Sequence, residues 1–198
     1  MAAETVTLGV IADTHIPDRV NSLHPQVLPL FRAAGVSAIL HAGDACVPEV
    51  LEELRQVAPV WAASGNRDPF FGLELPMVQT VQWVGVSIAL MHGHGGFLPY
   101  WLDKVHYVVQ GYRFERYQRV CRQAAGEAQV VIFGHTHHPE ARWLEGRLWF
   151  NPGSACHGLY GKEWPSLGLL HLNAEGAIVP EILPLTGYQR VQRSWKEK

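Results

Sequence analysis

The sequence predicts an α/β protein, built from a mixed β-sheet or a pair of sheets with flanking helices. Short apolar runs alternate with helical patterns as far as Asn66, and the last third of the chain alternates short runs with tight turns. Polar residues of metal-binding type follow five of the apolar runs. Ligands of α/β proteins bind beyond the carboxyl ends of parallel strands, so the positions of these residues agree with the predicted fold.

The N-terminal part is expected to form a βαβαβ unit. Its strands are rich in apolar and β-branched residues and end in polar turns, which is typical of strands buried on both faces. Gly35 closes the first helix, and Pro48 lies near the start of the second, where its missing N–H is tolerated. In chain order we expect a strand at Thr5–Asp13, a helix at Leu23–Ala34, a strand at Val36–Asp44, a helix at Val47–Val57 and a strand at Pro59–Asn66.

The rest of the chain is expected to add strands and one more helix. Pro and Gly residues indicate a loop over residues 68–76, and the break at Val84-Gly85 indicates a hairpin or two adjacent strands within Met77–His94. Gly146 and Gly176 mark tight turns. The remaining elements are a helix from about Tyr112 to Ala125, a buried strand at Ala128–His135, and antiparallel hairpins within Ala141–Ser154 and Leu167–Leu183.

Length and composition favour a single domain that spans residues 1–198. Of these 198 residues, 47% are hydrophobic and 17% are charged, which suffices for one sizeable core. The net charge of −2 provides no basic excess to neutralise phosphates. We therefore expect no nucleic-acid binding surface.

The cysteines and the hydropathy favour a cytoplasmic protein. Cys46, Cys121 and Cys156 are odd in number and lack C-x-x-C spacing, which argues against a disulfide framework and against a thiolate zinc site. The N-terminus lacks a signal-peptide pattern, and no run approaches the roughly 20 apolar residues of a membrane-spanning helix. Free thiols and no membrane partner are expected.

Two aspartates and a neighbouring histidine are the first candidate metal ligands. Asp13 and His15 follow the first strand two residues apart, so strand alternation could place both side chains on the same side of the backbone. Asp44 follows Gly43 at the next strand end, and its two carboxylate oxygens could bridge two cations. Taken singly, each aspartate could instead be the N-cap of a helix.

An asparagine and three further histidines extend this set. Asn66 could bind a cation through its carbonyl oxygen without adding charge, although an Asn beside a Gly is often a turn residue. His135 and His137 could address two neighbouring ions, with Gly134 allowing the backbone to approach. His92 adds an imidazole from its own strand end, and alone it could be a core histidine bonded to backbone.

The alternative roles, as helix N-caps, turn residues or core histidines, would have to hold independently at five strand ends of one chain. It is simpler for the seven residues to converge on a pair of divalent cations, which indicates hydrolysis of a phosphate ester.

These motifs, D-T-H, G-D, G-N-x-D, H-G-H and G-H-T-H in that order, resemble those of the calcineurin-like metallophosphoesterase superfamily. They are most similar to its small bacterial and archaeal phosphodiesterase branch, which shares its fold with the retromer scaffold subunit. The resemblance runs from Asp13 to His137, and the N-P-G-S of Asn151–Ser154 also matches. It implies a four-layer α/β/β/α sandwich that holds two metal ions. By that resemblance, one ion would be held by Asp13, His15, Asp44 and His137, and the other by Asp44, Asn66, His92 and His135.

Such a centre would attract and activate a phosphate. Two dications carry a charge of +4, and the carboxylates of Asp13 and Asp44 together with a bridging hydroxide carry −3. The net charge of the centre would be about +1. Ions about 3.5 to 4 Å apart can lower the pKa of a shared water and stabilise charge on the phosphoryl oxygens. Mn²⁺ is the ion we expect, and the oxygen and imidazole ligands would also accept Fe, Zn, Ni or Co.

Three further residues are candidate catalytic residues. Larger family members often have a histidine after the asparagine, commonly assigned to help the leaving group, and this chain has Arg67 there. His94 is the candidate replacement, as a general acid or through phosphate contact, and an exposed loop histidine is the alternative. Arg67 could fork onto a phosphate, or pair with Asp68 or a surface carboxylate. Asp68 could be an acceptor that orients a metal ligand.

An aromatic-rich insertion or lid occupies about residues 97–119. It could form a rim on which a nucleobase or aryl leaving group stacks. It could equally supply extra core or a contact in a homo-oligomer, and we favour this interpretation because aromatic residues bury area wherever they lie.

The expected function is that of a binuclear metal-dependent phosphoesterase acting on a small phosphate ester. A phosphodiesterase that works by direct attack of a metal-bridging hydroxide is the main hypothesis, and a phosphomonoesterase on the same site is an alternative. A non-catalytic protein-binding scaffold of the retromer-subunit type is the rival from another class. The filled ligand set favours the enzyme.

Overall fold

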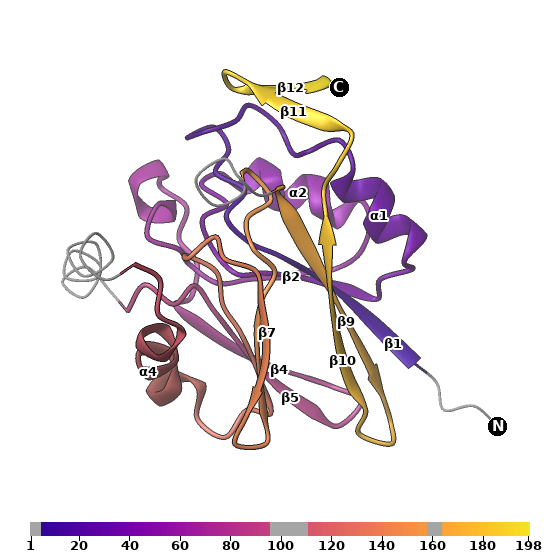
Figure 1. The fold of residues 1–198 in the computed structure, drawn as a ribbon, viewed down its shortest axis with the longest axis vertical. Coiled ribbons are helices and arrows are strands. Elements are labelled where there is room, and N and C mark those ends of the chain that lie inside the picture. The colour runs from indigo at the N-terminus through magenta and orange to yellow at the C-terminus, as the bar shows by residue number, and fades with distance from the viewer. Residues whose placement is uncertain (1–4, 96–110, 158–163) are drawn as a thin grey trace.

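One sheet is built around the N-terminal parallel strands. The computed structural model describes residues 5–95, 111–157 and 164–198 (Figure 1). Strands β1 (Thr5–Ile11), β2 (Ala38–His41) and β3 (Val60–Ala62) are parallel neighbours. On the other side of β1, β9 (Ser166–Asn173) and then β10 (Ile178–Pro184) pair antiparallel. The order of this sheet is β10-β9-β1-β2-β3.

The second sheet is also mixed, with the order β4-β5-β6-β8-β7. Its hairpin β4 (Val78–Trp83) and β5 (Val86–Met91) turns at Val84-Gly85, where both residues have positive φ, and confirms the predicted break. Strands β5, β6 (Val130–Ile132) and β8 (Arg147–Asn151) are parallel, and β7 (Glu140–Leu144) pairs antiparallel with β8.

The two sheets pack face to face and helices cover their outer faces. Leu8 and Val10 of β1 lie in the core between the sheets, together with Ile88 of β5 and Ile132 of β6. Along β1 the side chains alternate, so Ile11 instead joins the core under α1 (Val27–Ala33) and α2 (Pro48–Arg55). Helix α4 (Phe114–Ala125) packs on the outer face of the second sheet. The helices α1 and α2 and the helix α4 accordingly lie on opposite sides of the molecule (Figure 1). The α/β class and the α/β/β/α sandwich are confirmed.

Several boundaries differ from the prediction. Strands β1, β2 and β6 end before the polar residues that follow them, and Asp13, Asp44 and His135 have left-handed backbone conformations there. Helix α1 begins at Val27 rather than Leu23, since Pro25 disfavours helical backbone at His24. The predicted loop at 68–76 contains a short 3-10 helix, η1 (Asp68–Phe71).

A C-terminal hairpin, β11 (Tyr188–Val191) and β12 (Ser194–Glu197), was not predicted. It pairs with neither sheet, and it contacts the loop before α1, where Trp195 Nε1 donates to the Ser22 carbonyl oxygen (2.9 Å). Its strands are mostly exposed, so they lack the alternation that would have marked them.

Part of the aromatic-rich segment lies outside the described residues, namely 97–110. Of the remainder, Phe114 and Tyr117 are buried in the core under α4. No helix in the described part of the chain is long and apolar enough to cross a membrane. Cys46, Cys121 and Cys156 are buried free thiols.

Candidate metal centre

Both sheets bring polar residues to one edge. Asp13, Asp44 and Asn66 follow the parallel strands β1, β2 and β3 of the first sheet. His92 follows β5 of the second sheet, and His135 and His137 follow β6. The carboxyl ends of six parallel strands from two sheets therefore meet where the sequence-predicted ligands lie.

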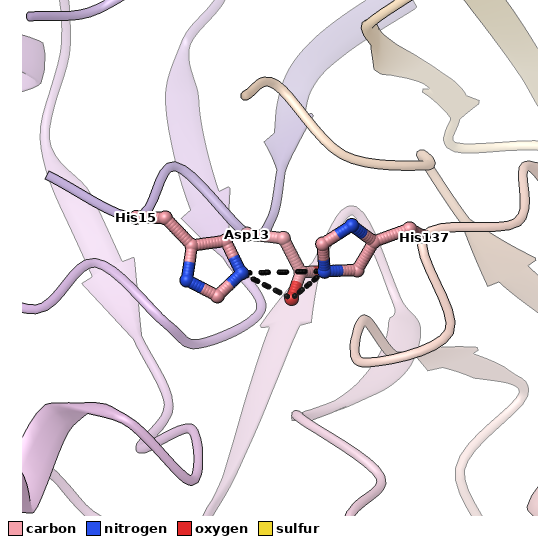
Figure 2. Close-up of side chains that lie close together, drawn as sticks. All are labelled: Asp13, His15 and His137. Atoms are coloured by element: carbon pink, nitrogen blue, oxygen red, sulfur yellow. Dashed lines mark hydrogen bonds and ion pairs between the residues drawn. The ribbon is translucent and has the colours of Figure 1, made fainter. Parts of the chain in front are cut away.

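The first group of side chains consists of Asp13, His15 and His137, whose ligand atoms point toward one another (Figure 2). Asp13 Oδ1 lies 3.2 Å from His137 Nε2 and 3.6 Å from His15 Nε2. The two imidazole nitrogens are 3.2 Å apart. Three ligand atoms within 4.8 Å of one another can surround one cation.

The second group is centred on Asp44. Its Oδ2 lies 3.5 Å from His92 Nε2 and 3.7 Å from His15 Nε2, so this carboxylate stands between the two groups. Asn66 Oδ1 lies 3.2 Å from His92 Nε2 and 3.0 Å from His135 Nδ1. The structure thus brings all seven predicted ligands into one cluster, with Asp44 in the position of a bridge.

The chemistry of this donor set fits divalent cations. His92 Nδ1–H donates to the Ala42 carbonyl oxygen (2.7 Å), which leaves a lone pair on Nε2 facing the oxygens of Asp44 and Asn66. Asp13 Oδ1 is buried and accepts no hydrogen bond from the described residues. Buried acceptor atoms that face one another repel, unless a cation lies among them. Oxygen and imidazole donors suit Mn, Fe, Co, Ni or Zn.

The titratable groups of the cluster shift one another's pKa values. Burial raises the pKa of Asp13, but the charges of His137 and His92 outweigh it and hold that pKa well below its usual range. Burial raises the pKa of Asp44, against the opposing charges of His92 and His15. Burial lowers the pKa of His92, but the charges of Asp44 and Asp13 outweigh it and the net pKa is raised. Burial holds the pKa of His135 well below its usual range. Asp13 is therefore an anion and the His135 ring is neutral at neutral pH.

Backbone geometry, rather than strand alternation, aims several of these side chains. Asp13, His15, Asp44, His135 and His137 all have positive φ, between 51° and 69°. Residues with a Cβ rarely adopt this conformation, and it persists only where the surroundings enforce it. The expectation that Asp13 and His15 share a side of an extended strand is wrong, since β1 ends at Ile11 and two left-handed residues bring the side chains together.

Glycines permit the close approach of these loops. A Cβ on Gly43 would lie 2.6 Å from His92 Nδ1, and a Cβ on Gly65 would collide with Asp44 Oδ1. At Gly134 it would lie 2.7 Å from the Ala42 carbonyl oxygen and 2.9 Å from Asp13 Oδ2. Each G-D, G-N and G-H motif therefore needs its glycine for space beside a candidate ligand.

The N-P-G-S segment supports two of the ligand loops. The side chain of Asn151 donates to the Gly134 carbonyl oxygen (2.9 Å) and to Thr136 Oγ1 (3.0 Å). Ser154 Oγ donates to the Asp13 carbonyl oxygen (2.9 Å). Both side chains are buried, and they fix the D-T-H and G-H-T-H loops against one another.

Asp68 lies behind the ligand loops. Its buried carboxylate accepts hydrogen bonds from the backbone N–H groups of Asp44 (3.1 Å), Cys46 (2.7 Å) and Gly65 (2.6 Å). These contacts tie the loop after β2 to the loop after β3. In this geometry Asp68 orients the backbone that carries Asp44 and Asn66.

Arg67 forms a bidentate pair with Asp18, at 2.8 and 3.1 Å, and not with Asp68. Its backbone N–H donates to Asp44 Oδ1 (2.7 Å). Sequence reasoning missed Asp18, whose Oδ2 also lies 3.5 Å from His15 Nδ1. The signal available was its position three residues after His15 in the D-T-H-I-P-D segment.

His94 and His157 lie beside the cluster. The His94 ring centroid is 5.4 Å from that of His92 and 6.3 Å from that of His135, and the side chain is buried rather than exposed. Burial and the charge of His92 lower the pKa of His94 to about 4.

The ring of His157 lies 4.5 Å from that of His137, and burial lowers the pKa of His157 to about 3. Its Nε2 accepts from Arg19 (2.8 Å).

Comparison with known proteins agrees with this arrangement. Residues 6–175 match the calcineurin-like phosphoesterase superfamily domain. A probable metallophosphoesterase of Methanothermobacter thermautotrophicus is 37% identical over 147 residues, which cover 74% of this chain and 76% of that protein. A phosphodiesterase of Methanocaldococcus jannaschii is 25% identical over 166 residues, which cover 82% and 91% of the two chains.

The fold is also shared with a vacuolar sorting protein. The structure of vacuolar protein sorting 29 from Cryptosporidium parvum superimposes with a TM-score of 0.66 at 20% identity, covering 91% of this chain and 98% of that one. At this identity the likeness concerns the fold alone.

Proposed function

The chain belongs to the calcineurin-like phosphoesterase superfamily, and we propose that it is a phosphodiesterase that works with two divalent metal ions. The observation that carries the proposal is the convergence of two carboxylates, one amide oxygen and four imidazoles at the edge shared by both sheets. When bound, two such ions supply Lewis acidity and a water activated for attack on phosphorus. The chain's own residues hold, orient and shield the reacting groups.

We assign the ligands to two overlapping sets. Asp13, His15, Asp44 and His137 would hold one ion, and Asp44, Asn66, His92 and His135 the other. Support comes from the position of Asp44 Oδ2 between His15 and His92, and from the amide oxygen of Asn66 beside His92 and His135. Mn²⁺ is the proposed ion, because oxygen ligands accompany the imidazoles and no thiolate belongs to the set.

Three neighbouring residues have proposed roles toward the substrate. His94 contacts a phosphate oxygen, to which its neutral ring offers one N–H donor and one acceptor. Arg67, held at one end of a bidentate pair with Asp18, supplies positive charge beside Asp44. Asp68 acts through the backbone of Asp44 and is thus a positioning residue.

The decisive experiment combines metal analysis with an activity screen. Protein loaded with Mn, Co, Ni or Zn should bind two ions per chain and hydrolyse bis(4-nitrophenyl) phosphate faster than 4-nitrophenyl phosphate. Faster turnover of the monoester would make the protein a phosphomonoesterase on the same site. Protein that retains no divalent ion and hydrolyses neither ester would leave the protein-binding scaffold, which the fold shared with vacuolar protein sorting 29 makes the second candidate.

Two variants separate metal binding from chemistry. Asp44→Asn should abolish turnover and lower the metal content at both positions, because the bridging charge is lost. His94→Ala should lower kcat at least about tenfold while the metal content stays at the wild-type value. Both are measured by elemental analysis and ester hydrolysis, with the exposed Glu49→Gln as a control that should change neither. Loss of metal in His94→Ala would remove His94 from its proposed role.

A cytoplasmic location and a small phosphate-ester substrate remain part of this proposal, and so does the homo-oligomer suggested by the aromatic-rich segment.

A further inference from the structure

We propose that a cavity beside the metal centre, whose described lining residues include no Asp, Glu, Lys or Arg, binds an uncharged apolar ester group of the substrate. This inference deepens the proposed function and rests on it. The cavity has a volume of about 340 Å³ and lies between α4 and the ends of β4 and β5. Its size is at the lower end of the range for small-molecule sites, about 300 to 1,000 Å³.

The lining defines the chemistry of the occupant. Side chains of β4, β5 and α4 supply apolar surface, and the polar side chains among the described lining residues are two histidines, a cysteine and a glutamine. Among the residues that the structure describes, no Asp, Glu, Lys or Arg lines the cavity. Burying a charged group without a partner is strongly unfavourable, so an aryl or alkyl group fits this space and a second phosphate does not. The lining consists of Met77, Val78, Met91, His92, Gly93, His94, Gly95, Val120, Cys121, Gln123 and Ala124.

The cavity and the metal centre share a wall. Residues 92–95 form it, and two of them are glycines with positive φ, which keeps the wall thin. A Cβ on Gly93 would already lie 3.3 Å from Cys121 Sγ on the cavity side. His92 faces the metal centre through Nε2, so the same short segment contributes to both sites.

His94 stands at the junction of the two sites. Its ring lies near the rings of His92 and His135, and its side chain also lines the cavity. Its Nδ1 is buried and has no hydrogen-bond partner among the described residues. A phosphate at the metal centre would place the oxygen of its retained ester near this unpaired nitrogen, and the retained ester group would extend into the cavity.

Exposed apolar side chains mark the entrance. Met77 is 49% exposed and Val120 is 37% exposed, whereas Met91, deeper in the cavity, is 3% exposed. A ligand group that covers these side chains gains about 25 cal/mol for each Å² of apolar surface removed from water. The flexible methionines can adapt to rings of different shape.

The first test compares two diesters with the same leaving group. Methyl 4-nitrophenyl phosphate and phenyl 4-nitrophenyl phosphate differ only in the retained ester, so a preference reports binding of that group. The wild-type protein should favour the phenyl ester at least about tenfold in kcat/KM, mainly through KM. In Ala124→Phe, which fills the cavity from the exposed surface of α4, this ratio should fall to near one.

Both kcat/KM values are measured on the same protein sample. A partial loss of folded protein lowers both values equally and leaves their ratio unchanged. Arg119→Phe adds the same ring to α4 at an exposed position outside the cavity and should keep the wild-type ratio.

The second test detects binding without turnover. The chain has three methionines, two of which line the cavity. In the zinc-loaded protein with ¹³C-labelled methionine methyl groups, phenylphosphonate should shift the Met77 and Met91 signals but not the Met1 signal. Methylphosphonate should leave all three in place, and Ala124→Phe should remove the response to phenylphosphonate.

The outcomes separate the cavity from the catalytic proposal. Hydrolysis of both diesters without a phenyl preference and without methionine shifts would leave the phosphodiesterase standing and overturn the cavity as a subsite. Methionine shifts without hydrolysis of any ester would overturn the proposed function, and with it the cavity's role toward a substrate. A phenyl preference that persists in Ala124→Phe would place the apolar group elsewhere and overturn the inference.

Discussion

At the scale of single residues, the candidate centre depends on residues that are not themselves candidate metal ligands. The candidate ligands Asp13, His15 and Asp44 adopt left-handed backbone conformations, which are unfavourable for residues with a Cβ. Hydrogen bonds hold these turns: the backbone N–H of Asp13 donates to the Gly43 carbonyl oxygen and that of His15 donates to the Asp44 carbonyl oxygen. The backbone N–H of Asp44 donates to the buried carboxylate of Asp68. The backbone of Asp44 is therefore held by Asp68, which contacts its N–H group and not its side chain.

Asp68→Asn tests this dependence. The amide keeps the shape of the side chain but turns one acceptor into an N–H donor that faces backbone N–H groups. We expect the free energy of unfolding of the metal-free protein to fall by about 2 to 3 kcal/mol and its metal content after loading to fall as well. Urea unfolding and elemental analysis provide the two readouts. Wild-type stability together with a loss of turnover alone would mean that Asp68 acts on the substrate instead.

At the scale of elements, short loops at the carboxyl ends of the strands carry the centre, and glycines allow them to touch. The loop after β3 approaches the loop after β2 so closely that no side chain fits at Gly65. Strand β2 is buried along its whole length and β1 along its second half, so these strands fix where their loops start.

Gly65→Ala should damage the centre while preserving the sheets. The added Cβ collides with Asp44 Oδ1, so the two loops must separate. We expect metal content and ester hydrolysis to fall at least about tenfold, with a far-ultraviolet circular dichroism spectrum like that of the wild type. Gly146→Ala is the control, because its turn has open space and only its positive φ (74°) is strained. That variant should lose about 1 kcal/mol of stability and keep its metal. Equal metal loss in both variants would contradict the steric argument.

The C-terminal hairpin is held by aromatic contacts with His24. The His24 ring lies 4.6 Å from the ring of Trp195 and 5.6 Å from that of Tyr188, and burial lowers its pKa from 6.5 to about 4. Below pH 6.5 the unfolded chain binds a proton at His24 that the folded chain does not bind.

This histidine should make the fold sensitive to acid. Its contribution to stability is fully present above pH 6.5, decreases as the pH falls toward 4, and is constant below that. In metal-free protein, the difference in unfolding free energy between the wild type and His24→Phe should shift by up to about 3 kcal/mol over this window, in favour of the variant at low pH. Urea unfolding at a series of pH values measures it. A difference independent of pH would show that His24 titrates normally in the folded protein.

At the scale of the whole molecule, the centre is the place where two sheets meet through their loops. Asp13, Asp44 and Asn66 come from the first sheet, and His92, His135 and His137 come from the second. Ions bound there would connect the two halves of the sandwich in addition to the apolar core between them.

Metal binding should therefore stabilise the entire fold. At a free metal concentration one hundred times the dissociation constant, each ion adds about 2.7 kcal/mol to the free energy of unfolding. We expect Tm to rise on addition of Mn²⁺, to return to the metal-free value with a chelator, and to respond weakly in Asp44→Asn. Differential scanning calorimetry provides the measurement. An unchanged Tm in the wild type at saturating metal would argue against cations that link the sheets.

The sequence alone determined the fold class, the order of most elements and the chemical nature of the candidate ligands. Periodicity marks β1, β2 and α2 because burial imposes a repeat on neighbouring residues. It missed β11 and β12, which are exposed and bury too little to leave a pattern. The residue types at Asp13, Asp44 and His135 could be identified because each follows an apolar run.

Only the tertiary structure decided how those residues are aimed and what lies around them. The hydrogen bonds from the backbone of Asp44 and Cys46 to Asp68, the pairing of Arg67 with Asp18 and the cavity beside His94 all join segments distant in the chain. Local sequence carries the preferences of neighbouring residues, whereas these contacts arise when two sheets pack and bring their loop ends together.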